Sequence, residues 1–265
     1  MRRYLSVPLD WDANTYERVG TGVMALGHEV LQRLELRGDE TVLDAGCGTG
    51  EVTAALAELV PRGRLFAVDG SPQMVEIARE RLAGRAKVWC QDLLELEAPE
   101  PVDLVFSTAT FHWIADHERL FERLRAALKP GGRLVAQCGG AGNIAAIREA
   151  IAEVSGDDWM PWNFATPQDT ERRLRAAGFS AARAWLYDRP VEPEEPLAFL
   201  KTLILGEHLQ RLPEADREGF ARSVLGRLET PFVARYVRLN IEATAGATPS
   251  RGPASGPHVG ASGTP

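Results

Sequence analysis

The chain has 265 residues, 45% of them hydrophobic, a length that suits one sizeable α/β domain with insertions or two small domains. Its formal net charge of −7 gives no support to nucleic-acid binding, which requires a basic surface. Because no run approaches the roughly 18 apolar residues of a membrane span, and no apolar run follows the basic N-terminus, we expect no membrane segment, no signal peptide and a cytoplasmic protein.

A helical spacing of apolar residues covers about 14–35, and beyond it strands and helices alternate. The sequence predicts strands over 41–44, 64–68, 86–90, 102–107 and 133–138. It predicts the joining helices over 51–60, 72–82 and 116–128, and a turn over 129–132. Because these strands are continuously apolar and are separated by helices, they indicate a parallel sheet that is covered on both faces.

After residue 139 the alternation becomes less regular. Helices are expected over 143–154, 167–177, 197–210 and 214–228. A sixth strand is expected over 181–187 and a last one over 233–243, although this last stretch could also be helical. From Ala245 the chain is mainly Gly, Pro, Ser, Thr and Ala, which cannot bury much apolar surface, so we expect a disordered tail.

A glycine-rich turn joins the first strand to its helix, in the stretch Val42-Leu43-Asp44-Ala45-Gly46-Cys47-Gly48-Thr49-Gly50. A strand, a tight glycine loop and a helix form the ligand-binding corner of an open α/β sheet. The dinucleotide fingerprint G-x-G-x-x-G would place its third glycine where Glu51 stands, so the spacing disfavours a dinucleotide. The acids Asp44 and Glu51 suit a cationic ligand instead. The alternative is a glycine turn of some other α/β protein.

This stretch resembles the first motif of the class I S-adenosylmethionine (SAM)-dependent methyltransferases, Asp-x-Gly-x-Gly-x-Gly. The matching residues are Asp44, Gly46, Gly48 and Gly50. SAM carries a sulfonium and an ammonium group and no phosphate. The resemblance therefore implies SAM as the cofactor, bound at these four residues.

Asp69 and Gly70 follow the second strand, and Asp69 comes 19 residues after Gly50. An acidic residue at this place can accept hydrogen bonds from both hydroxyls of a ribose. The alternative is a helix start, since Ser71 is suited to an N-cap and Pro72 to the first helical turn. The resemblance implies that Asp69 is the ribose-binding acid.

Asp92 and Leu93 stand just past the third strand. The resemblance implies that Asp92 meets the adenine amino group and that Leu93 flanks the adenine ring. The alternative for Asp92 is a solvated acid in a turn.

The fourth strand leads into Phe106-Ser107-Thr108-Ala109-Thr110-Phe111-His112-Trp113, and the carboxyl ends of strands are where open sheets bind ligands. The stretch resembles the Ser-Asn-Ala-x-x-(His or Gln)-Trp segment of the trans-aconitate methyltransferases and their relatives. The likeness extends to Trp11-Asp12, Tyr16, 116–119, 128–132 and 238–244, with Thr108 departing from the group's frequent Asn. It implies a cofactor contact for Ser107.

His112 is the one obvious group of this stretch that titrates near neutral pH, so it is a candidate general base. The alternative is a histidine that packs or forms structural hydrogen bonds. A carboxylate substrate would need no base, because it is already an anion at pH 7. Basic side chains of the variable region could then bind it, and the sequence does not rank Arg148, Arg183, Lys201, Arg235 and Arg238.

Aromatic side chains are candidates for the substrate pocket, namely Tyr16, Trp113 and Trp162. Residues 158–164 could roof the pocket or form the core of a cap. The histidines show no metal-ligand spacing. Cys47, Cys90 and Cys138 show no C-x-x-C pattern and are interpreted as small buried residues, so no metal is expected.

The resemblance implies a Rossmann-like α/β fold, with a seven-stranded, mostly parallel sheet, helices on both faces and a helical lid. The expected organisation is a helical lid segment over 1–40, a SAM-binding core over 41–139, cap insertions with the last strands over 140–244, and the tail over 245–265.

The function that the resemblance implies is methylation of a small molecule by SAM, with O-methylation of a carboxylic acid such as trans-aconitate as the reaction of that branch. Related enzymes methylate secondary metabolites, so a larger O-, N- or C-acceptor is an alternative. A nucleotide-dependent oxidoreductase and a non-catalytic SAM-binding protein are two further alternatives. We expect a monomer or a weak dimer.

Overall fold

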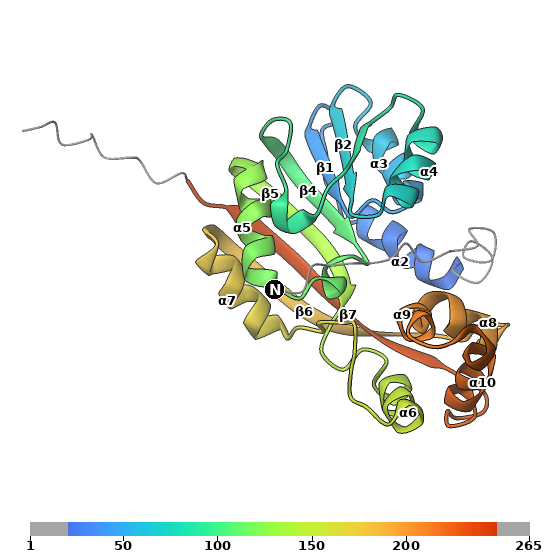
Figure 1. Ribbon diagram of the computed structural model, residues 1–265. Helices are drawn as coiled ribbons and strands as arrows, with labels where there is room; N and C mark the ends of the chain where they lie inside the picture. The colour runs from blue at the N-terminus through green and yellow to red at the C-terminus, as the bar shows by residue number, and fades with distance from the viewer. Residues whose placement is uncertain (1–20, 248–265) are drawn as a thin grey trace, which may run out of the picture.

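The computed structural model describes residues 21–247, which build one seven-stranded sheet (Figure 1). The strand order is β3-β2-β1-β4-β5-β7-β6. The strands are β1 Thr41–Ala45, β2 Arg64–Asp69, β3 Lys87–Cys90, β4 Val102–Thr108, β5 Leu128–Gly139, β6 Phe179–Val191 and β7 Ala234–Ala245. β1 to β5 pair in parallel, whereas β7 is antiparallel to both of its neighbours. The predicted seven-stranded, mostly parallel sheet is confirmed.

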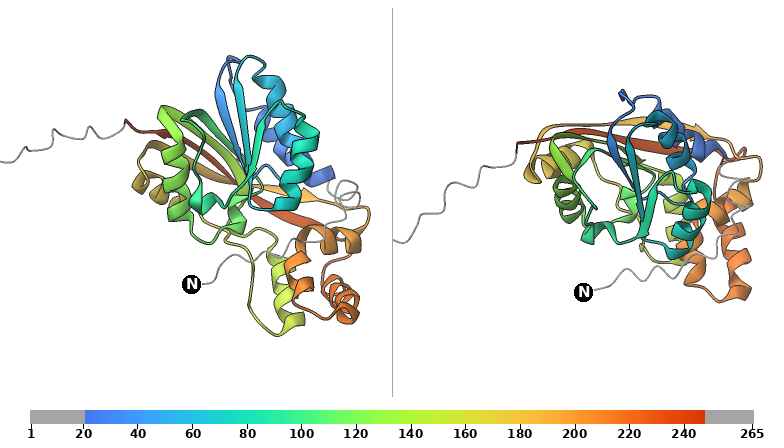
Figure 2. Two further views of the ribbon diagram at one scale, coloured as in Figure 1. Left: turned by 45° about the horizontal axis from the view of Figure 1, so that its top comes forward. Right: turned by 90° about the horizontal axis from the view of Figure 1, so that it is seen from above.

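Helices lie on both faces of this sheet (Figure 2). One face is covered by α2 Thr21–Leu31, α3 Glu51–Leu59 and α4 Pro72–Leu82, and the other by α5 His117–Ala127 and α7 Pro167–Ala176. Successive strand residues point to opposite faces, so Val42 packs toward α2 and α3 while Leu43 packs toward α5. Burial on both faces explains why the strands are continuously apolar.

A helical cap stands at one end of the sheet, and the long strands β6 and β7 run into it (Figure 1). Its elements are α6 Ala145–Ser155, α8 Pro196–Phe199, the π-helical turn η3 Leu200–Ile204, α9 Gly206–Gln210 and α10 Glu214–Leu225. The cap has an apolar core of its own, in which Phe199, Leu200 and Val224 are fully buried. Tyr236 of β7 belongs to this core, so the cap is packed onto the sheet through the start of β7.

Several predicted boundaries differ from the structure. The first helix ends at Leu31, where bonds such as Arg33 N–H to Val30 O tighten the chain, and residues 14–20 lie outside the described part. The predicted turn at 129–132 is a bulge within β5, because Val102 pairs with Leu128 and Leu104 with Arg133. The helix predicted over 197–210 is interrupted by η3.

Predictions for the chain end and for one cysteine also differ from the structure. Residues 234–245 form a strand, so the helical alternative for this stretch is wrong, and Ala245, which we assigned to the tail, belongs to β7. The tail residues from 248 lie outside the described part. Cys47 and Cys138 are buried as expected, but Cys90 is exposed because it ends β3, an edge strand.

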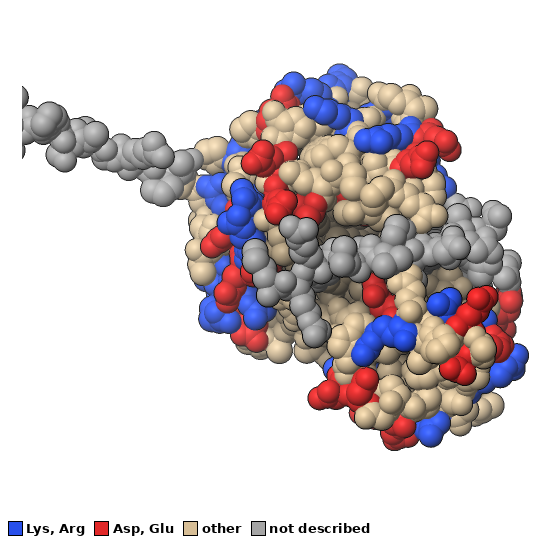
Figure 3. Space-filling view, viewed as in Figure 1, with Lys and Arg blue, Asp and Glu red and all other residues tan. Residues whose placement is uncertain are grey.

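The surface of the molecule is mixed in charge. Figure 3 shows acidic and basic side chains interspersed on the face that it presents. Within residues 21–247, no helix has the length and apolar character needed to cross a membrane.

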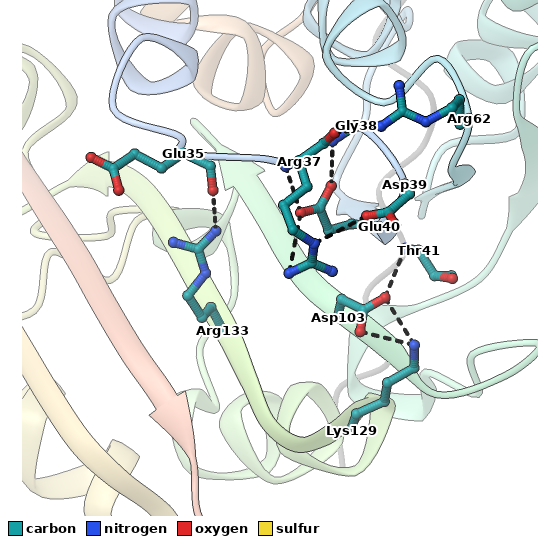
Figure 4. A network of polar contacts seen from close by, with 10 residues as sticks. All are labelled: Glu35, Arg37, Gly38, Asp39, Glu40, Thr41, Arg62, Asp103, Lys129 and Arg133. Carbon is teal, nitrogen blue, oxygen red and sulfur yellow. Dashed lines mark hydrogen bonds and ion pairs between the residues drawn. The ribbon is translucent and has the colours of Figure 1, made fainter.

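A polar network fixes the amino ends of three neighbouring strands (Figure 4). Asp103 of β4 accepts hydrogen bonds from the Thr41 N–H at 2.9 Å and from Lys129 Nζ at 2.8 Å. Partial burial raises the pKa of Asp103, but these two bonds and the charges of Lys129 and Arg37 outweigh it and hold the pKa below its usual value. Arg133 extends the network by donating to the Glu35 carbonyl. The network therefore joins β1, β4 and β5 at the end of the sheet away from the cap.

We expect Asp103→Ala to lower the free energy of unfolding by about 1–2 kcal/mol, because it leaves the buried Thr41 N–H without an acceptor. Asp39→Ala is the matched control, since its exposed pair with Arg37 is expected to contribute less than about 1 kcal/mol. Urea denaturation measures both changes. Equal midpoints for the two variants would show that the network does not stabilise the sheet.

Candidate active site

The glycine loop after β1 leaves open space at one of its three glycines. All three have positive φ angles, of 86° at Gly46, 54° at Gly48 and 77° at Gly50. A Cβ at Gly46 would lie 2.2 Å from Thr110 Oγ1, and one at Gly50 would lie 3.2 Å from Ala78 Cβ. A Cβ at Gly48 would meet nothing within 4 Å. Gly46 and Gly50 therefore permit close packing, whereas Gly48 exposes backbone to a ligand.

Asp69 joins this loop to the start of α4. Its carboxylate accepts the Gly48 N–H and the Ser71 N–H, each at 2.9 Å. Ser71 is the N-cap of α4, as predicted, because its hydroxyl accepts the Met74 N–H. Burial raises the pKa of Asp69, against the effect of these backbone bonds. A Cβ at Gly70 would also meet nothing within 4 Å, so Asp69 lies between two places with room for a ligand.

Asp44 is buried directly before the glycine loop, with an exposure of 2%. Burial, together with the charge of Asp69, raises its pKa to about 7 against the opposing effect of a 2.6 Å hydrogen bond from Thr53 Oγ1. Among the described residues, no basic side chain contributes to this pKa. Glu51 is held by His28 of α2, with 2.8 Å between His28 Nε2 and Glu51 Oε1. A positively charged ligand would favour the ionised form of Asp44.

Asp92 and Leu93 lie beyond the end of β3. Asp92 is exposed and caps the short turn Leu93–Glu95 by accepting the Leu94 N–H at 2.9 Å. Leu93 is 4% exposed and packs in the main apolar core. Their expected contacts with adenine stay predictions.

The end of β4 is bonded to the end of β1. Ser107 is 1% exposed, and its hydroxyl donates to the Ala45 carbonyl at 2.6 Å. Thr110 donates to the Gly46 carbonyl at 3.2 Å and occupies the space beside that glycine. Ala109 has a φ of 55°, which is strained for alanine, and the chain then turns into the short helix Phe111–Trp113. Thr110 was not among the predicted site residues.

A cavity of about 90 Å³ lies where this turn meets the cap and β7. Its lining includes His112, Trp113, Asn143, Trp162, Phe164 and Arg238. The predicted substrate residues Trp113 and Trp162 therefore come together here, with ring centroids 5.9 Å apart. Trp159 packs on His208 within the cap instead, and Tyr16 lies outside the described residues. The aromatic stretch thus supplies both pocket wall and cap core.

His112 is nearly enclosed at the edge of this cavity, with an exposure of 8%. The Gly139 N–H donates to His112 Nδ1 at 3.3 Å, and the ring stacks on Phe164 at a centroid distance of 5.8 Å. Burial lowers the pKa of His112 well below its usual value, and the charges of Arg238 and His117 act in the same direction. His112 is therefore neutral near pH 7, and the lone pair of Nδ1 is already used.

Arg238 brings a buried positive charge to the cavity. It is 2% exposed, and its Nε donates to Gln137 Oε1 at 3.2 Å. Burial lowers the pKa of Arg238, while nearby carboxyl, phenol and thiol groups oppose this effect. Among residues 21–247, no carboxylate forms an ion pair with Arg238.

The other basic candidates have different positions. Arg148 lies over the Phe164 ring at 5.6 Å and Arg183 over the Trp185 ring at 4.7 Å. Lys201 pairs with Glu218, and Arg235 is exposed. Only Arg238 of the five lines the cavity.

Comparisons with known proteins agree on one family. A family model described as a methyltransferase domain matches residues 42–132. The chain is 30% identical over 243 residues to a trans-aconitate 2-methyltransferase of Paracidovorax citrulli, covering 85% of this chain and 92% of that protein.

Solved structures show the same fold. The YcgJ protein of Bacillus subtilis superposes with a TM-score of 0.64 at 17% identity, covering 85% of this chain and 100% of that one. A phosphoethanolamine N-methyltransferase of Haemonchus contortus, in complex with S-adenosylhomocysteine, gives 0.62 at 19% identity, covering 88% and 57%.

We expect the affinity for SAM to fall as the pH is lowered from about 7 to 5. Asp44 has a pKa of about 7, and a cationic ligand favours its ionised form, so binding at lower pH must first remove a proton. This costs up to about tenfold in affinity per pH unit.

Calorimetric titration of SAM from pH 5 to 8 measures this slope. Asp44→Asn should bind more weakly at pH 8 and lose most of the pH dependence. A variant with the wild-type slope would show that Asp44 does not sense the ligand charge.

Proposed function

Because the chain belongs to the class I SAM-dependent methyltransferases, in the branch of the trans-aconitate methyltransferases, we propose that it methylates a carboxylate oxygen of a small organic acid such as trans-aconitate. SAM is its cofactor. Membership of this family does not define the methyl acceptor, because relatives of this kind differ in what they methylate.

The residues of the glycine loop suit SAM. Open space borders Gly48 and Gly70, and the Asp69 carboxylate lies between them, where it would accept hydrogen bonds from the ribose hydroxyls. Asp44 would place negative charge below a cationic ligand. We assign Gly46 and Gly50 to the shape of the loop, and Asp92 to the adenine end of the site.

Arg238 is the single observation that carries the proposal of a carboxylate substrate. A buried charge without a counter-ion is costly, and a ligand of opposite charge removes that cost. The guanidinium matches a carboxylate through two parallel hydrogen bonds. Nε is already bonded to Gln137, so the remaining donors are available to a ligand in the cavity.

The cavity walls would strengthen this ion pair. Trp113, Trp162 and Phe164 are apolar surfaces that exclude water, and charges attract more strongly where water is excluded. The cap supplies two of these rings, so packing of the cap on β7 closes the pocket. The site would hold the substrate oxygen in line for reaction, which is where most of the rate increase would arise.

When bound, the cofactor supplies a methyl group on a sulfonium, and its transfer to a carboxylate oxygen gives a methyl ester and a neutral thioether without release of a proton. The chain therefore needs no general base for this acceptor. The arrangement of His112 fits that requirement, because its Nδ1 lone pair is already engaged by the Gly139 N–H.

We expect the wild-type protein to transfer labelled methyl from SAM to a small acid in a panel that includes trans-aconitate, and to form a methyl ester by mass. We expect Arg238→Met to lower kcat/KM for that acid by about 100-fold or more, because a buried charge pair loses one partner. Affinity for SAM should stay unchanged.

Arg235→Met is the matched control, since Arg235 lies on the same strand but is exposed. It should keep kcat/KM within about threefold, as expected for a surface change. Transfer to amines or hydroxyls alone, or equal kinetics for the two variants, would overturn the proposed carboxylate site.

A further inference from the structure

The hydrogen bond from Gly139 to His112 fixes the tautomer of the imidazole. A backbone N–H always donates, so His112 Nδ1 must be the nitrogen without a hydrogen, and in the neutral ring the hydrogen is on Nε2. The position of Gly139 is itself constrained, because a Cβ there would lie 2.6 Å from Phe164 Cε1 and 2.8 Å from Asn143 Nδ2. The ring is thus held by packing as well as by this bond.

The other buried histidines of the described chain use their nitrogens in the opposite way. Nε2 of His117 lies 2.9 Å from the Phe111 carbonyl, and Nε2 of His208 lies 3.4 Å from the Trp159 carbonyl. In both, Nδ1 is the buried atom without a partner. In His112, Nδ1 accepts the Gly139 N–H. Nε2 has no hydrogen-bond partner within residues 21–247, but unlike the Nδ1 atoms of the other two histidines it is not fully buried.

From this contrast and the place of His112 in the cavity wall, we propose that His112 is a neutral hydrogen-bond donor to the substrate carboxylate. Its Nε2–H would act beside Arg238. This inference rests on the proposed function, and it assigns His112 the role of a substrate-positioning residue in place of a general base.

The charges of the cavity favour a neutral donor here. Arg238 already supplies a positive charge to the cavity, and a protonated histidine beside it would be repelled by that charge. A carboxylate offers about four lone-pair sites on two oxygens. Arg238 and His112 can therefore bind it from two walls, β7 and the turn after β4, and leave a lone pair free to bond the methyl carbon.

The decisive comparison uses the acid that the wild type methylates. A glutamine at position 112 can accept from Gly139 through its oxygen and donate through its nitrogen, but it cannot act as a base. We expect His112→Gln to keep kcat/KM within about fivefold. We expect His112→Leu to lose about 10- to 100-fold, mostly in KM, because it removes a hydrogen bond to a charged group. Both variants should bind SAM like the wild type.

A pH profile separates a donor from a base. We expect kcat/KM of the wild type and of His112→Gln to follow the same curve between pH 6 and 9. Loss of activity in His112→Gln equal to that in His112→Leu, or an acid limb that is present in the wild type and absent in His112→Gln, would overturn the assignment.

The tautomer can be measured without turnover, which keeps this inference distinct from the proposed function. In protein labelled with ¹⁵N-histidine, the His112 signal, identified by its absence from His112→Gln, should show a protonated Nε2 and an unprotonated Nδ1 at pH 7. A protonated Nδ1 would overturn the inference even if the acid is methylated. Correct tautomers without methylation of any acid would overturn the carboxylate substrate, and with it the acceptor proposed for Nε2–H, and would leave only the tautomer of His112 established.

Discussion

The site depends on charge that is buried without a counter-ion. Asp44 lies beneath the glycine loop with a pKa raised to about 7, and Arg238 lies at the cavity with no paired carboxylate among the described residues. Each is costly for the folded protein alone and favourable once a ligand of opposite charge is bound. A cationic cofactor at one end and an anionic substrate at the other would relieve both costs, so the two ligands of the proposed reaction fit the two buried charges.

The fold explains how Arg238 is held in place. Its partner Gln137 also donates to Tyr187 and Asn240, each at 3.3 Å. Tyr187 in turn donates to Glu29 of α2 at 3.1 Å. A chain of hydrogen bonds therefore runs from Arg238, through Gln137 of β5 and Tyr187 of β6, to α2, and His28 of α2 also contacts Glu51 at the start of α3, directly after the glycine loop. The cavity and the region of the glycine loop are therefore both connected to α2 by polar contacts.

Local features of the site could be predicted from the sequence. The glycine loop and Asp69 are defined by residues close together in the chain, and their positions follow from the rule that ligands bind at the carboxyl ends of parallel strands. The continuously apolar runs likewise predicted the strands, because a parallel sheet is buried on both faces. By contrast, the bulge at 129–132 depends on pairing between β4 and β5, and the exposure of Cys90 depends on β3 being an edge strand. Neither follows from local pattern.

The basic residue that lines the cavity could not be identified from the sequence. Arg238 meets Gln137 across 101 residues, and its antiparallel strand brings it to the cavity only once β7 is inserted between β5 and β6. No feature of the sequence distinguished Arg238 from the four other basic residues that could bind a carboxylate. The state of His112 likewise depends on one N–H from Gly139, 27 residues away, which no spacing indicates.

The most direct test of the central claim is a calorimetric titration of the protein saturated with S-adenosylhomocysteine. The two ligands would be trans-aconitate and its triamide, in which all three carboxylates are replaced by uncharged groups of nearly the same shape. If Arg238 binds a carboxylate in the cavity, the acid should bind about 100-fold or more tightly than the amide. Equal affinities would contradict the account, because a pocket built around a buried positive charge must distinguish them.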